Sequence, residues 1–96
     1  MDIDTDKLVV EDDPELHAFV IRYEGQRALV AYRKREGTII YTHTEVPAEL
    51  EGHGIAGRLA KHALDYARAN GLRVVPQCPY VAAYIERHPE YRDLVG

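Results

Sequence analysis

Features that would place this chain in a secreted or a membrane class are missing. A single cysteine, Cys78, cannot form an internal disulfide. The longest apolar runs, such as residues 28–32, are far shorter than the roughly 20 residues needed to cross a bilayer. The N-terminus combines no positive charge with an apolar stretch, as a secretory signal would. We therefore expect a cytoplasmic protein that spans no membrane.

An excess of positive charge is missing too. The chain holds 16 acidic and 12 basic residues, which gives a formal net charge of −4. No basic face typical of nucleic-acid binding is evident. Seven of the acidic residues lie within residues 1–15, next to a single lysine. The remainder is therefore mildly positive, which favours an anionic, phosphate-bearing ligand.

Metal-ligand spacing is also absent. The five histidines and the single cysteine form no close pair such as Cys-x-x-Cys or His-x-x-x-His. We therefore expect no metal site.

What is present is the composition of one soluble folded domain. The chain has 96 residues, of which 46% are hydrophobic and 29% charged, and these values are typical of globular proteins. Residues 1–15 show little periodicity, apart from an apolar stretch at 8–10 that could form a brief edge strand. We assign residues 1–15 to a loose acidic leader and residues 16–96 to a single domain, with no internal repeat.

Three strands are predicted in the first half of the domain. Residues 16–23 alternate in character, residues 27–34 are rich in strand formers, and residues 38–46 are almost entirely β-branched or aromatic. Pro47, which cannot donate to a strand ladder, ends the third run. Glycine-containing turns separate the runs, which indicates an antiparallel meander.

Helices and a further strand are predicted in the second half. Apolar residues recur at helical spacing between about 54 and 70, and Asn70-Gly71 supplies a left-handed stop. The short run 72–75 then returns as a strand parallel to an earlier one. Pro79 opens a second helix over 80–87, and the tail 90–96 packs by Tyr91 and Leu94. The order is β-β-β-α-β-α, a mixed α/β sheet.

The loop between the third strand and the first helix carries the most informative motif. Backbone amides at a helix start have no partner within the helix and lie at the positive end of its dipole, so they can bind an anion. Glycines at 52, 54 and 57 would let the backbone approach that anion closely. The alternative is that these glycines only form the tight turn into the helix.

At this loop the sequence resembles the GNAT superfamily of acetyl-CoA-dependent N-acetyltransferases. The signature of that superfamily is Gln or Arg, two residues, Gly, one residue, then Gly or Ala. This chain reads Glu51-Gly52-His53-Gly54-Ile55-Ala56. The likeness extends to the segments 42–47, 75–80 and 87–91, covers roughly residues 16–95, and points to a compact stand-alone single-domain branch.

The resemblance implies an acyl-CoA N-acyltransferase-like fold in which the strand ending near Val46 and the strand 72–77 splay apart. It implies that the pantetheine arm of CoA lies between them and that the thioester lies near Cys78. The expected CoA-binding residues are Thr44, Val46, Glu51, Gly52, His53, Gly54, Ile55, Ala56, Gly57 and Arg58.

Two features depart from the family pattern. Glu51 stands where Gln or Arg is usual and puts a negative charge beside the expected pyrophosphate, for which Arg58 could compensate in part. The chain also lacks the helices that usually follow the first strand and help to enclose the amine. The acceptor is therefore the least constrained part of the prediction.

Acetyl transfer to an amine needs groups that can accept and donate protons. Glu45 lies near the end of the strand, where the resemblance places the reaction, and could take the amine proton. His43 shares its face of the strand, and its imidazole suits proton transfer near neutral pH. The alternatives are an exposed loop acid for Glu45 and a hydrogen-bonded sheet histidine for His43.

Two further candidates could protonate the departing thiolate. Cys78 precedes a helix start, where the dipole favours a thiolate, although it could equally be a small buried residue that lines the CoA slot. Many members of the superfamily use a tyrosine of the last helix. Tyr84 is the nearest candidate here, with a core aromatic as the alternative.

The leading functional hypothesis is an acetyl-CoA-dependent N-acetyltransferase that acts on a small-molecule or protein amine. A non-catalytic module that binds or senses CoA is the alternative, and a protein-interaction domain that keeps only the fold is a third. The sequence leaves the acceptor and the oligomeric state open.

Overall fold

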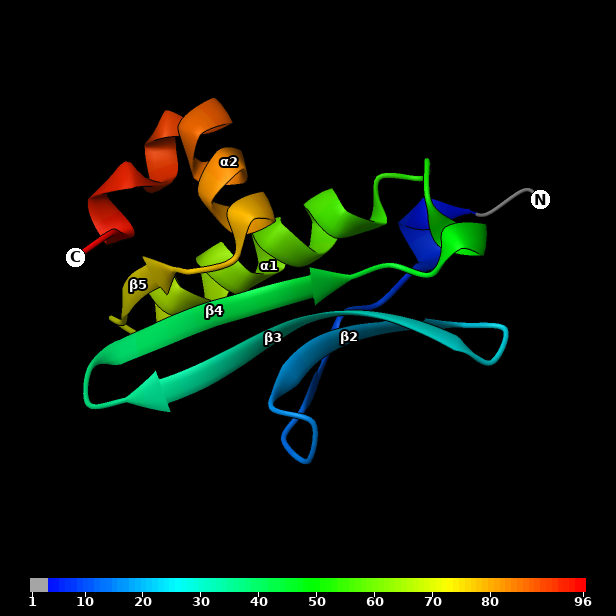
Figure 1. The fold of residues 1–96 in the computed structure, drawn as a ribbon, viewed down its shortest axis with the longest axis horizontal. Helices are drawn as coiled ribbons and strands as arrows, with labels where there is room; N and C mark the ends of the chain where they lie inside the picture. The colour runs from blue at the N-terminus through cyan, green and yellow to red at the C-terminus, as the bar shows by residue number, and fades with distance from the viewer. Residues whose placement is uncertain (1–3) are drawn as a thin grey trace.

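The computed structural model describes residues 4–96 and contains one five-stranded sheet in the order β1-β2-β3-β4-β5. The strands β1 to β4 pair antiparallel with their neighbours, and β5 pairs parallel with β4, as expected. The elements are β1 (Glu11–Asp13), β2 (Ala18–Tyr23), β3 (Gln26–Arg35), β4 (Thr38–Glu45), α1 (Ile55–Ala69), β5 (Arg73–Pro76) and α2 (Pro79–Arg87), with short 3-10 helices η1 (Thr5–Lys7), η2 (Ala48–Leu50) and η3 (Pro89–Leu94) (Figure 1). The predicted order β-β-β-α-β-α is confirmed, with β1 added at the edge of the sheet.

The backbone explains where the strands begin, turn and end. Strand β2 begins at Ala18, two residues later than predicted, because His17 adopts a left-handed conformation with φ of 50°. The hairpin from β2 to β3 turns through Glu24 and Gly25, whose φ values of 47° and 78° suit a tight two-residue turn that matches the twist of the strands. Strand β4 ends at Glu45, one residue earlier than predicted.

The described part of the acidic leader contributes to the sheet. Residues 1–3 lie outside the described residues. Strand β1 pairs with β2 through Asp13↔Ala18 and the two positions before it, so the edge strand lies at Glu11–Asp13 rather than at residues 8–10. The 3-10 helix η1 precedes it and is capped by Asp4, whose side chain accepts a hydrogen bond from the backbone N–H of Asp6.

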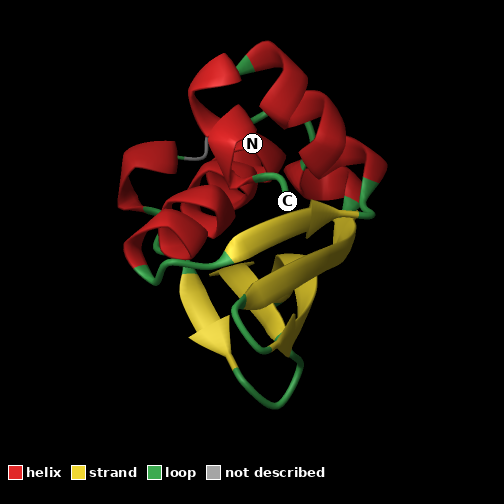
Figure 2. Ribbon diagram, turned by 90° about the vertical axis from the view of Figure 1, so that its left-hand side faces the viewer, coloured by secondary structure: helices red, strands yellow, loops and turns green. Residues whose placement is uncertain are grey.

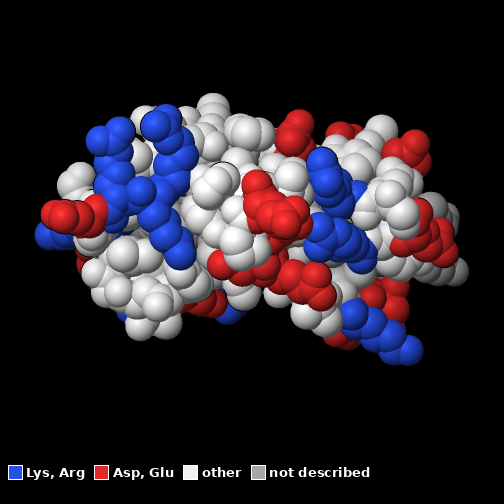
Figure 3. Space-filling view, turned by 90° about the horizontal axis from the view of Figure 1, so that it is seen from below, with Lys and Arg blue, Asp and Glu red and all other residues white. Residues whose placement is uncertain are grey.

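The helices α1, α2 and η3 gather on one side of the sheet (Figure 2). We call the other side the uncovered face. Side chains there alternate along each strand with those that enter the core, and Ala18, Val20 and Leu29 form a small buried cluster of their own. From this side, a basic group lies at one end of the molecule, and acidic and basic side chains lie next to one another elsewhere (Figure 3).

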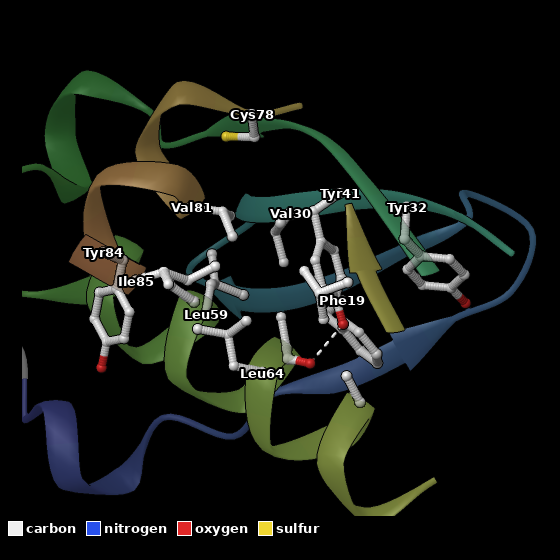
Figure 4. Packing of buried hydrophobic residues seen from close by; sticks show 14 of the residues in the cluster. Phe19, Val30, Tyr32, Tyr41, Leu59, Leu64, Cys78, Val81, Tyr84 and Ile85 are labelled. Carbon is white, nitrogen blue, oxygen red and sulfur yellow. Dashed lines mark hydrogen bonds between the residues drawn. The ribbon is translucent and has the colours of Figure 1, made fainter. Parts of the chain in front are cut away.

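The main core fills the space between the sheet and the helices. The apolar stripe of α1 is buried there, as predicted, against side chains such as Phe19, Val30 and Tyr41 (Figure 4). The Tyr41 hydroxyl donates a hydrogen bond to the Ala63 carbonyl oxygen, which fixes α1 on the strand. Burial of each such side chain contributes roughly 1.5–3 kcal/mol. Tyr91 and Leu94 of the tail are also buried, as expected.

Helices of membrane-spanning length and hydrophobicity do not occur within residues 4–96.

Candidate functional site

The sheet opens between β4 and β5. The two strands pair from Thr38↔Arg73 to Tyr41↔Pro76, and the last link is a 2.9 Å hydrogen bond from the Cys78 backbone N–H to the Tyr41 carbonyl. Beyond Tyr41, β4 runs on to Glu45 without a partner on this side. The predicted splay of the two strands is therefore present, and the free edge of β4 offers backbone donors and acceptors to a ligand.

A bulge marks the point of divergence. On the β3 side, Ala31 pairs with His43 and Tyr32 pairs with Tyr41, so one β4 residue, Thr42, has no opposite position. A bulge of this kind bends the strand and increases its local twist. It therefore turns the end of β4 away from β5 where the pairing stops.

A cavity of about 700 Å³ occupies the opening. It runs from the free part of β4 to the start of α1 and is bordered by Tyr80 of α2. We call it the main cavity. Its lining residues are Thr44, Glu45, Val46, Leu50, Glu51, Gly52, Gly54, Ile55, Ala56, Gly57 and Tyr80.

The start of α1 forms one end of the main cavity. Gly54 is the N-cap residue with a φ of 73°, a left-handed conformation that favours glycine, and no side chain caps the helix there. The first intrahelical bond is donated by Arg58 to the Gly54 carbonyl. The amides of Ile55, Ala56 and Gly57 therefore have no partner within the helix, and together with the helix dipole they favour an anion.

The space in front of this loop is open. A Cβ placed on Gly52 or Gly54 would meet no atom within 4 Å. The loop therefore leaves room for a group to approach the backbone, which fits a phosphate better than a turn packed against the protein.

Charged side chains around the loop modify its electrostatics. Glu51 is exposed and contributes to the cavity lining. Arg58 and His53 do not line the cavity, although both were predicted to bind CoA. The Arg58 guanidinium lies 3.2 Å from Asp6 of the leader, so a carboxylate already neutralises the nearest cation.

Tyr80 is the lining residue that the sequence prediction missed. It lies in the first turn of α2, and its hydroxyl is 3.7 Å from where a Cβ on Gly57 would stand. The Tyr80 side chain thus reaches from α2 to the start of α1. The sequence signal that could have identified it is a polar aromatic residue directly after Cys78-Pro79, at the start of the second predicted helix.

Cys78 and Thr44 meet beside the cavity. The Cys78 sulfur is buried and lies 3.2 Å from the Thr44 hydroxyl oxygen. Thr44 lines the cavity, whereas Cys78 is not among its lining residues. The structure thus brings together the predicted CoA-binding strand and the predicted catalytic cysteine.

His43 and Glu45 form an exposed pair. The Nε2 atom of His43 lies 3.5 Å from the Glu45 carboxylate, as expected for two side chains on one face of a strand. Glu45 lines the main cavity, whereas His43 reaches it only through Glu45.

Tyr84 lies away from the other candidates. Its ring is buried and stacks on His88 at 3.9 Å between centroids, and burial raises the pKa of its hydroxyl. Tyr84 does not line the main cavity, and its hydroxyl points away from Cys78 (Figure 4). Its surroundings are those of a core aromatic residue.

Within residues 4–96, no group of three or more His, Cys, Asp or Glu side chains gathers as metal ligands would.

Comparison with known proteins gives a consistent result. The model of the family described as GCN5-related N-acetyl-transferase matches residues 18–94. Protein NATD1 from Mus musculus is 36% identical over 83 residues, which cover 83% of this chain and 76% of that protein. Protein NATD1 from Danio rerio is 33% identical and covers 99% of this chain and 90% of that protein.

A solved structure shares the fold. The solution structure of a GCN5-like protein from Staphylococcus aureus superposes with a TM-score of 0.73 at 27% identity, and the match covers 93% of this chain and 88% of that chain.

Proposed function

The chain belongs to the family of GCN5-related N-acetyltransferases, and we propose that it transfers an acetyl group from acetyl-CoA to an amine. The observation that carries the proposal is the main cavity, which joins an uncapped helix start to the free edge of β4. A phosphate group suits the uncapped helix start, and an amide-containing arm suits the free edge of β4. CoA carries both, and members of this family generally use acetyl-CoA.

The loop would hold the pyrophosphate. The residues with free backbone amides, Ile55 to Gly57, line the cavity, and the Tyr80 hydroxyl lies near Gly57, where it could donate a hydrogen bond to the same group. Because backbone amides supply most of the contacts to the pyrophosphate, the exposed carboxylate of Glu51 reduces the affinity for CoA without removing the site. The free edge of β4 around Thr44 would hold the pantetheine arm.

The reaction forms one bond and breaks another. The amine nitrogen attacks the thioester carbonyl carbon, the new C–N bond replaces the C–S bond, the amine gives up one proton, and the thiolate takes one up. Glu45 lies at the cavity and can accept the amine proton, with His43 beside it to pass that proton to solvent. Cys78, next to Thr44, is the candidate donor to the thiolate.

A second candidate function is a module that binds CoA without turnover. It is favoured by the position of Tyr84, which is packed in the core and does not reach the main cavity. In that case Cys78 would only be a buried residue that packs against Thr44, and Glu45 would be an exposed acid.

Two measurements test these functions in order. Calorimetry with CoA should give a saturable heat, and no heat at millimolar CoA would contradict both functions. A thiol-release assay with acetyl-CoA and a panel of amines then separates them. Release of CoA thiol that depends on both the amine and the protein supports the transferase, and CoA binding without release supports the second function.

A further inference from the structure

A second, smaller cavity lies on the uncovered face of the sheet at the end of β4. Its volume is about 330 Å³ and its lining residues are Arg27, Leu29, Glu45, Val46 and Pro47. We call it the rear pocket. Glu45 and Val46 line both the rear pocket and the main cavity. The two cavities therefore meet at the end of β4, one on each side of the strand.

The rear pocket combines opposite charges with an apolar floor. Glu45 supplies a carboxylate at the side shared with the main cavity, and Arg27 supplies a guanidinium from β3. Leu29 pairs with Glu45 in the strand register and is buried. The apolar surface between the charges can hold a short hydrocarbon chain.

Both charges are open to a ligand. In the part of the chain that the structure describes, Glu45 pairs only with His43, and no ion pair involves Arg27. Arg22, which lies opposite Arg27 in the register, is already held by Glu11 and Asp13. A molecule that carries an ammonium and a carboxylate group could neutralise Glu45 and Arg27 at the same time.

The strand geometry sets the separation of the two charges. Arg27 lies two residues along β3 from Leu29, the partner of Glu45, and two residues of an antiparallel strand span about 7 Å. The two side chains are too far apart to pair directly, since no contact within 4.0 Å joins them. A few carbon atoms between the charged groups of a ligand would bridge them.

We infer that the acceptor is a small primary amine that also carries a carboxylate, such as a β- or γ-amino acid. Its amine lies at Glu45, where the carboxylate first binds the ammonium group and then accepts its proton, and its own carboxylate lies at Arg27. The inference rests on the proposed function, because it places the acceptor on the opposite side of β4 from CoA. It differs from that function in naming the class of acceptor.

The first experiment compares matched amines. The value of kcat/KM is measured with β-alanine against ethylamine and with γ-aminobutyrate against propylamine, at saturating acetyl-CoA. The carboxylated amine of each pair should be preferred about tenfold, the lower end of what a hydrogen bond to a charged group supplies. Equal values within each pair overturn the inference and leave the proposed function standing.

The second experiment uses variants. Arg27→Leu should lower the preference for the carboxylated amines toward one, mainly through KM, and Arg27→Lys should restore part of it. Arg33→Leu is the matched control, because Arg33 is an exposed arginine on the same strand and the same face but outside the rear pocket. A preference that falls equally in both variants overturns the inference.

A binding measurement separates failure of the inference from failure of the proposed function. Titration of the CoA-bound protein with γ-aminobutyrate should shift the backbone amide signals of Leu29 and Val46. Shifts confined to other residues contradict the inference. Absence of turnover with every amine, although CoA binds, contradicts the proposed function and the inference with it.

Discussion

The Thr44 hydroxyl oxygen lies 3.2 Å from the Cys78 sulfur, although 34 positions separate the two residues in the chain. The contact joins the free part of β4 to the residue that precedes α2. It lies where the two strands diverge, beside the main cavity. This contact thus links the strand expected to bind CoA with the only cysteine of the chain.

Replacement of this cysteine tests whether it takes part in the chemistry. Cys78→Ala should lower turnover by at least about tenfold, since proton transfer by a positioned group typically contributes 10²–10⁴-fold, while the Kd for CoA stays near that of the wild type. The measurements are the thiol-release rate and calorimetry. Cys78→Ser is the matched control, because a hydroxyl can still donate to the thiolate. Wild-type turnover in Cys78→Ala would show that the cysteine is only a buried residue packed against Thr44.

Gly54 tests the anion site. Gly54→Glu places a carboxylate in front of the free amides at the start of α1 and should abolish CoA binding in calorimetry. The substitution also strains the backbone, because φ at this position is 73° and a left-handed residue other than glycine costs roughly 1–2 kcal/mol. Gly25→Glu is the control, since Gly25 has a φ of 78° and equally open space but lies in the β2–β3 hairpin, outside the lining of the main cavity. It should show a similar loss of thermal stability but bind CoA normally.

Asp6 is expected to weaken CoA binding by pairing with Arg58. Asp6→Asn should free the guanidinium and raise CoA affinity about two- to fivefold at low salt, because an exposed ion pair is worth at most about 1 kcal/mol. The gain should shrink as salt screens the charges. Asp4→Asn removes the same charge from the same segment without touching Arg58. An equal gain in both variants would show that the net charge of the leader, rather than the pair, controls affinity.

His62 should make stability depend on pH. The side chain is half-buried against the Phe19 ring, and burial lowers its pKa below the ordinary value of 6.5, despite the opposing charges of Asp65 and Asp12. The unfolded chain therefore binds the proton more readily, so the free energy of unfolding should fall as the pH drops below 6.5. Denaturant titrations of the wild type and of His62→Gln check this.

The His62→Gln variant should lose less stability on acidification than the wild type does. His43→Gln removes an exposed imidazole instead and serves as the control. Asp65 changes the free energy of unfolding only at a lower pH. Burial alone would raise the pKa of Asp65, but hydrogen bonds from Lys61 and Tyr91 lower it below 3.8, so its contribution is present above that value and is lost beneath it. An unchanged slope in His62→Gln above pH 5 would contradict the assignment.

Much of the fold could be predicted from local patterns. The β-branched run that became β4 and the apolar stripe of α1 have the periods of a strand and a helix, and both were identified within one residue of their observed ends. The glycines before α1 likewise indicated a helix start, and Gly54 has the positive φ that the loop requires. The leader was predicted less well, because the three charged residues of β1 carry no apolar alternation.

Part of the candidate site was also predicted. Most of the residues expected to bind CoA line the main cavity, whereas His53 and Arg58 do not. The catalytic candidates Cys78, Glu45, His43 and Tyr84 stay predictions until they are tested by mutation. The cavity position of Tyr80 was missed, because a helix pattern shows where a side chain lies around its own helix but not what stands opposite it.

The elements and the glycine loop follow from the sequence alone, because they depend on the preferences of neighbouring residues. Tertiary packing sets which distant residues come together: Thr44 contacts Cys78, Arg58 pairs with Asp6, and Arg27 and Glu45 line the same rear pocket. Those pairings depend on strand register, on the bulge at Thr42 and on the packing of α1 and α2 against the sheet. Each of these is set by the sum of many contacts between segments far apart in the chain, which no local pattern records.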